Sequence, residues 1–149
     1  MPLPASLEEF LTAWDAFRAG IGFEEITDTL GIEPHACDGA TLAMRIPLAP
    51  RLRQAGGMFS ATALFGAADV TGTFLAMQAL EPGLFPLAVQ SSLNFIDNSR
   101  SGPAVATARL VRAGRTIVVA SVDVADADGK LLATSSFTYV PKPFSPKGD

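Results

Sequence analysis

The sequence predicts an α+β domain in which an antiparallel sheet wraps around one long central helix. Residues 58–80 are apolar, rich in alanine and glycine, and too long for a strand, which indicates a buried helix. From Leu84 onward, segments with strand patterns alternate with turn-rich segments up to the end of the chain. These strands are expected to cover the helix, because no other segment carries enough apolar surface to do so.

Two helices are expected before this core. Ser6 followed by Glu9 is a capping-box pattern. A helix up to about Arg18 should follow, because four apolar side chains then recur at helical spacing. They are Phe10, Leu11, Trp14 and Phe17. A second, short helix is predicted over residues 24–30, because Gly31 follows it as a C-cap glycine would.

The sheet should begin with a hairpin, since Asp38-Gly39 supplies the positive φ angles of a tight turn between residues 32–37 and 40–46. The short turns between the later strands predict consecutive antiparallel pairing, a four-stranded meander. Its strands are expected over residues 84–96, 104–112, 116–125 and 131–140. In the third of them small apolar side chains share one face, which predicts a sheet covered mainly on one side. The other face and the edges stay available for a partner subunit.

One domain is predicted over residues 1–149, because this length suffices for a single core and is short for two. We expect a helical segment over residues 1–31, the core over 32–141 and a flexible tail over 142–149.

Composition and charge exclude several kinds of function. The net charge of −4 argues against nucleic acid as the main partner. One cysteine, Cys37, and one histidine, His35, provide neither an internal disulfide nor a Cys/His zinc site, so no metal is expected. The start of the chain lacks a basic and then apolar leader, and polar residues interrupt the longest apolar stretch. The prediction is a soluble, cytoplasmic protein that does not enter a membrane.

Asp69 is the only charged side chain between Arg53 and Glu81. A carboxylate in an apolar setting is costly unless it is paired, hydrogen-bonded or neutralised, which favours a functional role. The structural alternative is that Asp69 faces solvent or is satisfied by Thr71 and Thr73. Thr73 lies one turn further along the same helix face. It could orient a water molecule for Asp69, or it could bond the carbonyl of residue 69.

Several short motifs, in this order and spacing, resemble one family. They are Gly56-Gly57, the stretch over residues 63–69, Leu93-Asn94-Phe95, Gly114-Arg115, Asp128-Gly129-Lys130 and Phe137-Thr138-Tyr139. Together they resemble the hotdog-fold acyl-CoA thioesterases, in particular the PaaI-type branch of phenylacetic acid degradation, over residues 32–141. The resemblance implies a hotdog fold in which the sheet wraps around the helix.

In that family a helix-borne Asp or Glu acts as base or nucleophile, nine residues after the His of a His-Gly-Gly sequence. The resemblance therefore implies this catalytic role for Asp69. An ungapped count places Ser60-Ala61-Thr62 where the family has His-Gly-Gly, although a match to Gly56-Gly57 with an insertion is the alternative. The backbone amides of Ala61 and Thr62 could still polarise the thioester carbonyl, helped by the helix dipole.

The spacing between these groups predicts an assembly. Nine residues of helix span about 13 to 14 Å, so one helix cannot bring both its start and Asp69 to the same carbonyl carbon. A homodimer with antiparallel neighbouring helices would bring the Ala61 end of one subunit to Asp69 of the other. Two sites per dimer follow from the symmetry. A homotetramer, as a dimer of dimers, is the other expected state.

Other candidates concern the substrate. Gln54 and Ser60, with Thr62, would contact the thioester region, since some relatives carry a Gln at the position of Gln54. Arginines can pair with coenzyme A phosphates, although each is otherwise a solvated surface charge. The candidates are Arg100, Arg112 and Arg115, with Lys130. Three phenylalanines could line an acyl pocket, or simply pack in the core. They are Phe59, Phe65 and Phe74.

The sequence thus predicts hydrolysis of a small aryl- or medium-chain acyl-CoA thioester without any cofactor, coenzyme A being part of the substrate. An acyl-carrier-protein thioester is the other possible substrate. The main alternative is a non-catalytic acyl-CoA binding protein of the same fold, which the missing His favours. A hydratase or dehydratase normally pairs its Asp with a His near the helix start, so Ser60 disfavours it. A structural subunit of a larger assembly is the remaining alternative.

Overall fold

The computed structural model describes residues 2–144. Both N-terminal helices are confirmed. Helix α1 spans Leu7–Ala19, and the Ser6 hydroxyl accepts a hydrogen bond from the Glu9 amide at 3.2 Å, which satisfies one of the free amides at the helix start. Helix α2 spans Ile26–Leu30 and ends at Gly31, whose φ of 62° is the left-handed conformation that glycine adopts readily.

All six strands belong to one antiparallel sheet with the order β1-β2-β4-β5-β6-β3. The predicted hairpin is present as β1 (Glu33–Cys37) and β2 (Thr41–Ile46). The later strands are β3 (Leu84–Phe95), β4 (Ala104–Ala113), β5 (Val118–Ala125) and β6 (Leu131–Pro143). The predicted α+β class is therefore confirmed.

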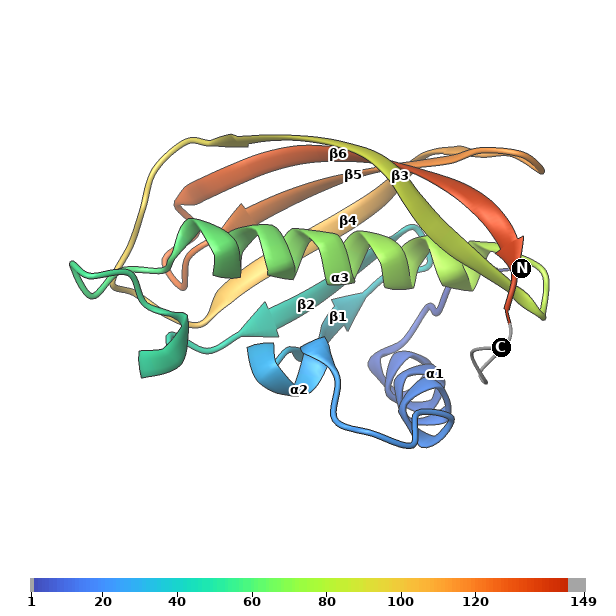
Figure 1. Cartoon of the computed structure of the whole chain (residues 1–149), viewed down its shortest axis with the longest axis horizontal. Helices are drawn as coiled ribbons and strands as arrows, with labels where there is room; N and C mark the ends of the chain where they lie inside the picture. The colour runs from blue at the N-terminus through green and yellow to red at the C-terminus, as the bar shows by residue number, and fades with distance from the viewer. Residues whose placement is uncertain (1, 145–149) are drawn as a thin grey trace.

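The predicted meander is correct for β4, β5 and β6 and wrong for β3. Strand β3 pairs with β6, from Leu84 opposite Pro143 to Phe95 opposite Ala133, and β2 takes the place beside β4. The connection over residues 96–103 explains the difference, because it is too long for a tight hairpin and can carry the chain across to another strand. Strand β3 consequently lies at an edge of the sheet (Figure 1).

The predicted flexible tail over residues 142–149 is also wrong at its start. Strand β6 continues through Lys142 and Pro143, which lie opposite Phe85 and Leu84 of β3. Residues 145–149 of that tail lie outside the described residues. The long edge strand β3 provides the backbone partners that extend β6 beyond its predicted end.

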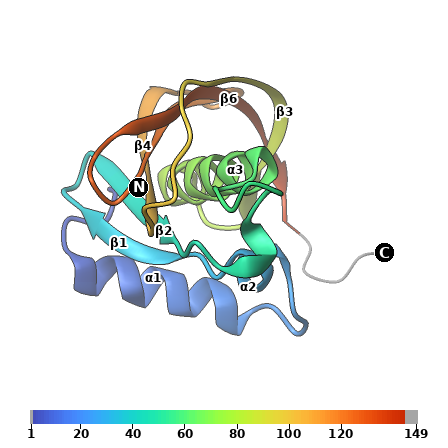
Figure 2. The same cartoon turned by 90° about the vertical axis from the view of Figure 1, so that its left-hand side faces the viewer.

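Helix α3 (Ala61–Ala79) lies in the concave face of the sheet (Figure 2). It begins three residues later than the apolar stretch that predicted it, after the short 3-10 helix η1 (Pro50–Leu52) and an irregular segment. Alternate residues of β5 from Val118 to Val124 are buried, as the one-sided pattern predicted. Gly72 permits the close packing, because a Cβ there would lie 2.6 Å from the Tyr139 hydroxyl oxygen of β6.

Helices α1 and α2 lie on the side of α3 that the sheet leaves open (Figure 2). An aromatic cluster joins α1 to α3, with the Phe74 ring 5.5 Å from Phe10, 5.2 Å from Trp14 and 5.9 Å from Phe17, between ring centroids. Such rings bury large apolar areas and hold α1 firmly against the central helix. Within residues 2–144, no helix is both long and apolar enough to cross a bilayer.

Candidate active site

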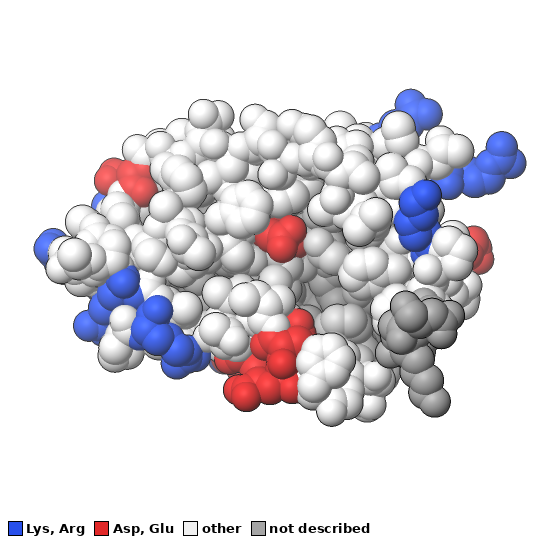
Figure 3. All heavy atoms as spheres, viewed as in Figure 1, with Lys and Arg blue, Asp and Glu red and all other residues white. Residues whose placement is uncertain are grey.

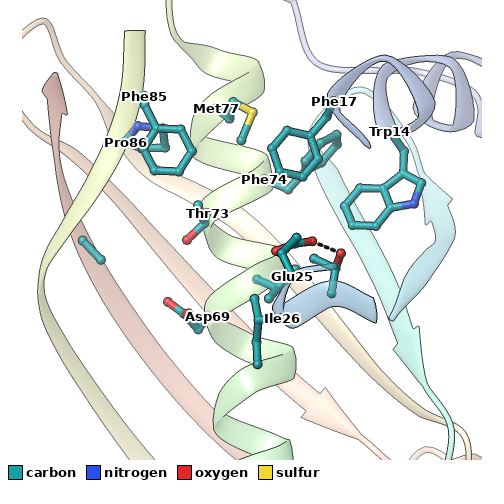
Figure 4. Close-up of a pocket in the computed structure, with 13 residues that line it drawn as sticks. Trp14, Phe17, Glu25, Ile26, Asp69, Thr73, Phe74, Met77, Phe85 and Pro86 are labelled. Carbon is teal, nitrogen blue, oxygen red and sulfur yellow. Dashed lines mark hydrogen bonds between the residues drawn. The ribbon is translucent and has the colours of Figure 1, made fainter. Parts of the chain in front are cut away.

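Asp69 projects from the middle of α3 into a pocket between α3, the N-terminal helices and β3 (Figure 4). The side chain is partly buried, and no hydrogen bond or ion pair joins it to another residue in the described part of the chain. Thr71 does not satisfy it, since the Thr71 hydroxyl donates to the Ala67 carbonyl at 2.7 Å. Burial raises the pKa of Asp69 above its ordinary value of 3.8. The carboxylate is therefore more basic than an exposed one and free to accept a proton.

The pocket beside Asp69 has a volume of about 280 Å³ and mostly apolar walls. Thr73 lies beside Asp69 on α3, as the spacing along the helix predicted, and both side chains line the pocket. Figure 3 shows acidic side chains beside the hollow on this face, surrounded largely by uncharged atoms. A carboxylate and a hydroxyl at the wall of an apolar pocket are suited to handling a water molecule next to a bound apolar group.

Tyr139 of β6 lies behind this part of α3. Burial raises the pKa of its phenol, the nearby Thr73 side chain opposes the rise, and the Asp69 carboxylate adds to it. The hydroxyl has no hydrogen-bond partner among the described residues. The phenol is therefore neutral at pH 7, and it lies close enough to Asp69 for the carboxylate to disfavour its ionisation.

The start of α3 offers free backbone donors. Ser60 is the N-cap, and its hydroxyl accepts a hydrogen bond from the Ala63 amide at 3.0 Å. The amides of Ala61 and Thr62 have no acceptor within the helix, and both residues are exposed. Gly57, with a φ of 81°, belongs to a turn before the helix, so Ser60 stands at the helix start as the ungapped count expected. The positive end of the helix dipole lies at these two amides.

Asp69 and these amides do not meet within one chain. They are separated by seven or eight helical residues, which corresponds to about 11 to 12 Å along the helix. The structure therefore keeps the two halves of the predicted site at different places on the subunit.

Gln54 and Arg100 lie together near the start of α3. The Gln54 side chain accepts a hydrogen bond from the Gly56 amide, and an Arg100 nitrogen donates to the Gly56 carbonyl at 2.8 Å. Gln54 thus stabilises the turn before the helix. Arg115 lies elsewhere, because Arg100 precedes β4 and Arg115 follows it, and the ends of a ten-residue strand are about 30 Å apart.

A second hollow, of about 620 Å³, lies near the same end of the molecule. Arg45, Arg53 and Arg100 line it together with Glu33, which pairs with Arg45 at 2.7 Å. Figure 3 shows basic side chains gathered at this end. The sequence identified Arg100 as a candidate for phosphate binding. It did not identify Arg53, because Arg53 precedes the central helix and belongs to no recognisable motif. Lys130 lines another hollow together with Arg100, and its ammonium donates to the Asn98 carbonyl at 2.6 Å.

The three candidate phenylalanines have different surroundings. Phe74 lines the pocket beside Asp69, while Phe65 and Asp69 together line a neighbouring hollow along β3. Phe59 is fully buried in the core. The walls that sequence reasoning missed come from α1, α2 and β3. They include Trp14, Phe17, Glu25, Ile26 and Phe85. No local pattern connects these residues to Asp69, because only the tertiary fold brings them to α3.

Across residues 2–144, no group of three or more His, Cys, Asp or Glu side chains could hold a metal ion. The groups that the candidate site offers are a carboxylate, a hydroxyl, backbone amides and an apolar pocket.

Known proteins resemble this chain in sequence and in structure. A sequence model of the thioesterase superfamily matches residues 56–133, just over half of the chain. A curated relative from Saccharolobus solfataricus, named "putative esterase", is 24% identical over 117 residues, which cover 78% of this chain and 77% of the relative. A thioesterase crystal structure from Haemophilus influenzae is 25% identical and covers 78% of this chain and 82% of its own, with a TM-score of 0.76. A thioesterase structure from Pseudomonas aeruginosa is 22% identical, and the match covers 90% of this chain and 94% of that one. Its TM-score of 0.80 shows the same fold.

Proposed function

Because this chain belongs to the thioesterase superfamily, we propose that it hydrolyses acyl-CoA thioesters and that Asp69 performs the chemistry. The predicted hotdog fold is confirmed, and the family supports acyl-thioester hydrolysis in general. The PaaI-type branch and the acyl group stay predictions. The observation that carries the proposal is Asp69 itself, an unpaired and partly buried carboxylate with a raised pKa in an apolar pocket.

As a general base, Asp69 takes a proton from a water molecule while that water attacks the thioester carbonyl carbon. The carbon–sulfur bond then breaks, and the departing thiolate receives the proton from Asp69. Thr73, beside Asp69 in the pocket, places the water. As a nucleophile, Asp69 would instead attack the carbonyl carbon and displace the thiolate to form an anhydride, which water hydrolyses to the free acid and the Asp69 carboxylate. Both routes need an ionised Asp69.

Both routes also need donors for the carbonyl oxygen, and we assign them to a partner subunit's helix start. The amides of Ala61 and Thr62 are free at that place, about 11 to 12 Å from Asp69 of the same chain. The exposed edge strand β3 supports a homodimer. Its outer edge has no strand partner among the described residues, and Leu87 and Val89 are 50% and 54% exposed there. A long apolar edge is normally covered or paired.

Coenzyme A would extend from the thioester carbon toward the start of α3. Arg53 and Arg100 line the hollow at that end, and guanidinium groups match phosphate geometry well. The guanidinium of Arg53 donates two hydrogen bonds to the Leu48 carbonyl, at 3.1 and 3.0 Å, which holds it in place. A fixed cation loses little conformational freedom when a phosphate binds.

The test is a thiol-release assay with a panel of acyl-CoA thioesters on the wild type and Asp69→Asn. Asn keeps the size of the side chain and removes its basicity. We expect the wild type to turn over at least one aryl- or medium-chain substrate, and Asp69→Asn to lose at least about 100-fold in kcat. Full activity in Asp69→Asn would remove this mechanism. Asp15→Asn, on an exposed position of α1, is the matched control and should keep the wild-type rate.

One alternative rests on a specific observation. Ser60 occupies the N-cap where the resembled family has a histidine, so the site lacks an imidazole. This favours a protein that binds acyl-CoA without turnover. Tight binding of acyl-CoA with no thiol release across the panel would establish that alternative.

A further inference from the structure

We propose that the pocket beside Asp69 selects uncharged acyl groups and rejects acyl groups that end in a carboxylate, and that Glu25 enforces this selection. The inference rests on the proposed thioester function, because it takes the acyl group as the occupant of the pocket. It adds a specificity residue from the N-terminal segment, which the chemistry at Asp69 does not itself require.

The walls of the pocket suit an acyl group. Trp14 and Phe17 of α1, Phe74 and Met77 of α3, and Phe85 of β3 supply apolar surface (Figure 4). An apolar cavity of about 150 Å³ is large enough for benzene. The volume here is about 280 Å³, so an aromatic ring with a short linker, or a medium-length chain, fits. With the thioester carbonyl at Asp69, the attached acyl group enters this space.

Glu25 is held at the wall of the pocket. Its backbone amide donates to an Asp28 carboxylate oxygen at 3.0 Å, at the start of α2. The Thr27 hydroxyl donates to Glu25 Oε1 (Figure 4), and Arg18 donates to the Thr27 hydroxyl oxygen at 3.0 Å. Glu25 and Asp28 also form a reciprocal capping box at the start of α2. The carboxylate is thus held in place at the wall of the pocket by Thr27 and by the start of α2.

The charged side chains that line the pocket are both acidic. Asp69 and Glu25 are its only charged lining residues within the described chain, and no Lys, Arg or His lines it. Arg18 does not offset them, because its guanidinium pairs with Asp28. A carboxylate at the far end of a bound acyl group would lose its hydration and meet the like charge of Glu25. An uncharged acyl group meets no such penalty.

Two substrates of equal chain length test the proposal. Hexanoyl-CoA and adipoyl-CoA both carry six-carbon acyl groups, and only adipoyl ends in a carboxylate. Their affinities are measured by calorimetry with Asp69→Asn protein, and their kcat/KM values with protein that retains Asp69. We expect the protein to bind and hydrolyse hexanoyl-CoA better than adipoyl-CoA. Glu25→Gln should narrow this difference on the order of tenfold, because it should raise the affinity and kcat/KM for adipoyl-CoA and leave those for hexanoyl-CoA unchanged. Glu25→Lys should reverse the preference.

Glu24→Gln is the matched control, since Glu24 is exposed, adjacent in sequence and not part of the pocket. It should leave the preference unchanged. Equal affinity of Asp69→Asn protein for the two substrates, with equal kcat/KM values in the wild type, would overturn the proposal. An unchanged preference in Glu25→Gln, with normal hexanoyl-CoA affinity, would overturn it as well.

Thermal unfolding of each variant shows whether α2 is intact. Should Glu25→Gln unfold, Ile26→Lys provides the second test, because it places a cation at the same wall without touching Glu25. It should improve adipoyl-CoA binding, and an unchanged preference would again contradict the proposal. Selective binding without hydrolysis would overturn the proposed enzymatic function and support this selectivity.

Discussion

At the scale of single residues, Asp69 combines a cost in stability with a gain in reactivity. Burial raises its pKa and nothing in the described chain compensates its charge. A folded-state pKa above the unfolded value means that the folded protein binds the extra proton more tightly. Stability therefore falls as pH rises from 3.8 through the raised pKa, and the penalty is complete above it. Functional sites commonly retain such destabilising groups.

This linkage predicts that Asp69→Asn is more stable than the wild type at pH 7, although it is less active. The gain should shrink as pH falls and vanish below about 3.8, where the wild-type carboxyl is protonated in both states. Denaturant unfolding at several pH values measures it. A destabilised Asp69→Asn at pH 7 would show that the carboxylate has a favourable partner after all.

The same raised pKa predicts the pH dependence of catalysis. Since the base must be ionised, kcat/KM should rise with pH through the raised pKa of Asp69 and then level off. The midpoint should lie above 3.8, the value of an ordinary Asp carboxyl. A rate already at its plateau down to that pH would argue against Asp69 as the base.

At the scale of elements, α1 is expected to act as one wall of the acyl pocket and as part of the core. Trp14→Ala should destabilise the fold by about 3 to 5 kcal/mol, because a buried aromatic ring against Phe74 is removed. It should also weaken acyl-CoA binding, since Trp14 lines the pocket. Leu11→Ala, on the same helix and 42% exposed, should cost less than about 1 kcal/mol. Denaturant unfolding and calorimetry check both effects.

The elements that local patterns specify were predictable. The Ser6 cap, Gly31 and the Asp38-Gly39 turn act within a few residues of themselves, so the sequence around them suffices. Strand β3 was placed wrongly because its pairing with β6 is decided by how residues 96–103 cross the sheet. Hydrophobic alternation carries no information about which strand lies next to which.

The candidate site likewise contains residues that local sequence identifies and residues that only the tertiary fold reveals. Asp69 stood out from the sequence because its neighbours are uncharged for many residues on both sides. Glu25 and Trp14 could not be recognised, since charged and aromatic residues are common in surface helices and only packing against α3 brings them to the pocket. Arg100 and Arg115 appeared equivalent as basic residues at strand ends, and the direction of β4 separates them.

At the scale of the whole molecule, edge strand β3 is the feature that the proposed dimer must explain. Val89→Lys places a charge on this edge, as natural edge strands often do to prevent pairing. We expect a shift to monomer and a loss of at least about tenfold in activity. Val111→Lys, on the interior strand β4 and 61% exposed, is the control and should keep both the dimer and the wild-type activity. Sedimentation velocity measures the oligomeric state. A Val89→Lys protein that is still a dimer would exclude the β3 edge as the dimer interface.

The central claim is that each site combines Asp69 of one subunit with the helix start of the other, and a mixing experiment tests it most directly. Ala61→Pro removes one amide donor and is tolerated at the first position of a helix. Asp69→Asn and Ala61→Pro should each be nearly inactive alone. In mixed dimers one of the two sites is intact, so an equal mixture, unfolded and refolded together, should regain about a quarter of the wild-type activity. Activity no higher than the average of the two separate variants would contradict a site shared between subunits.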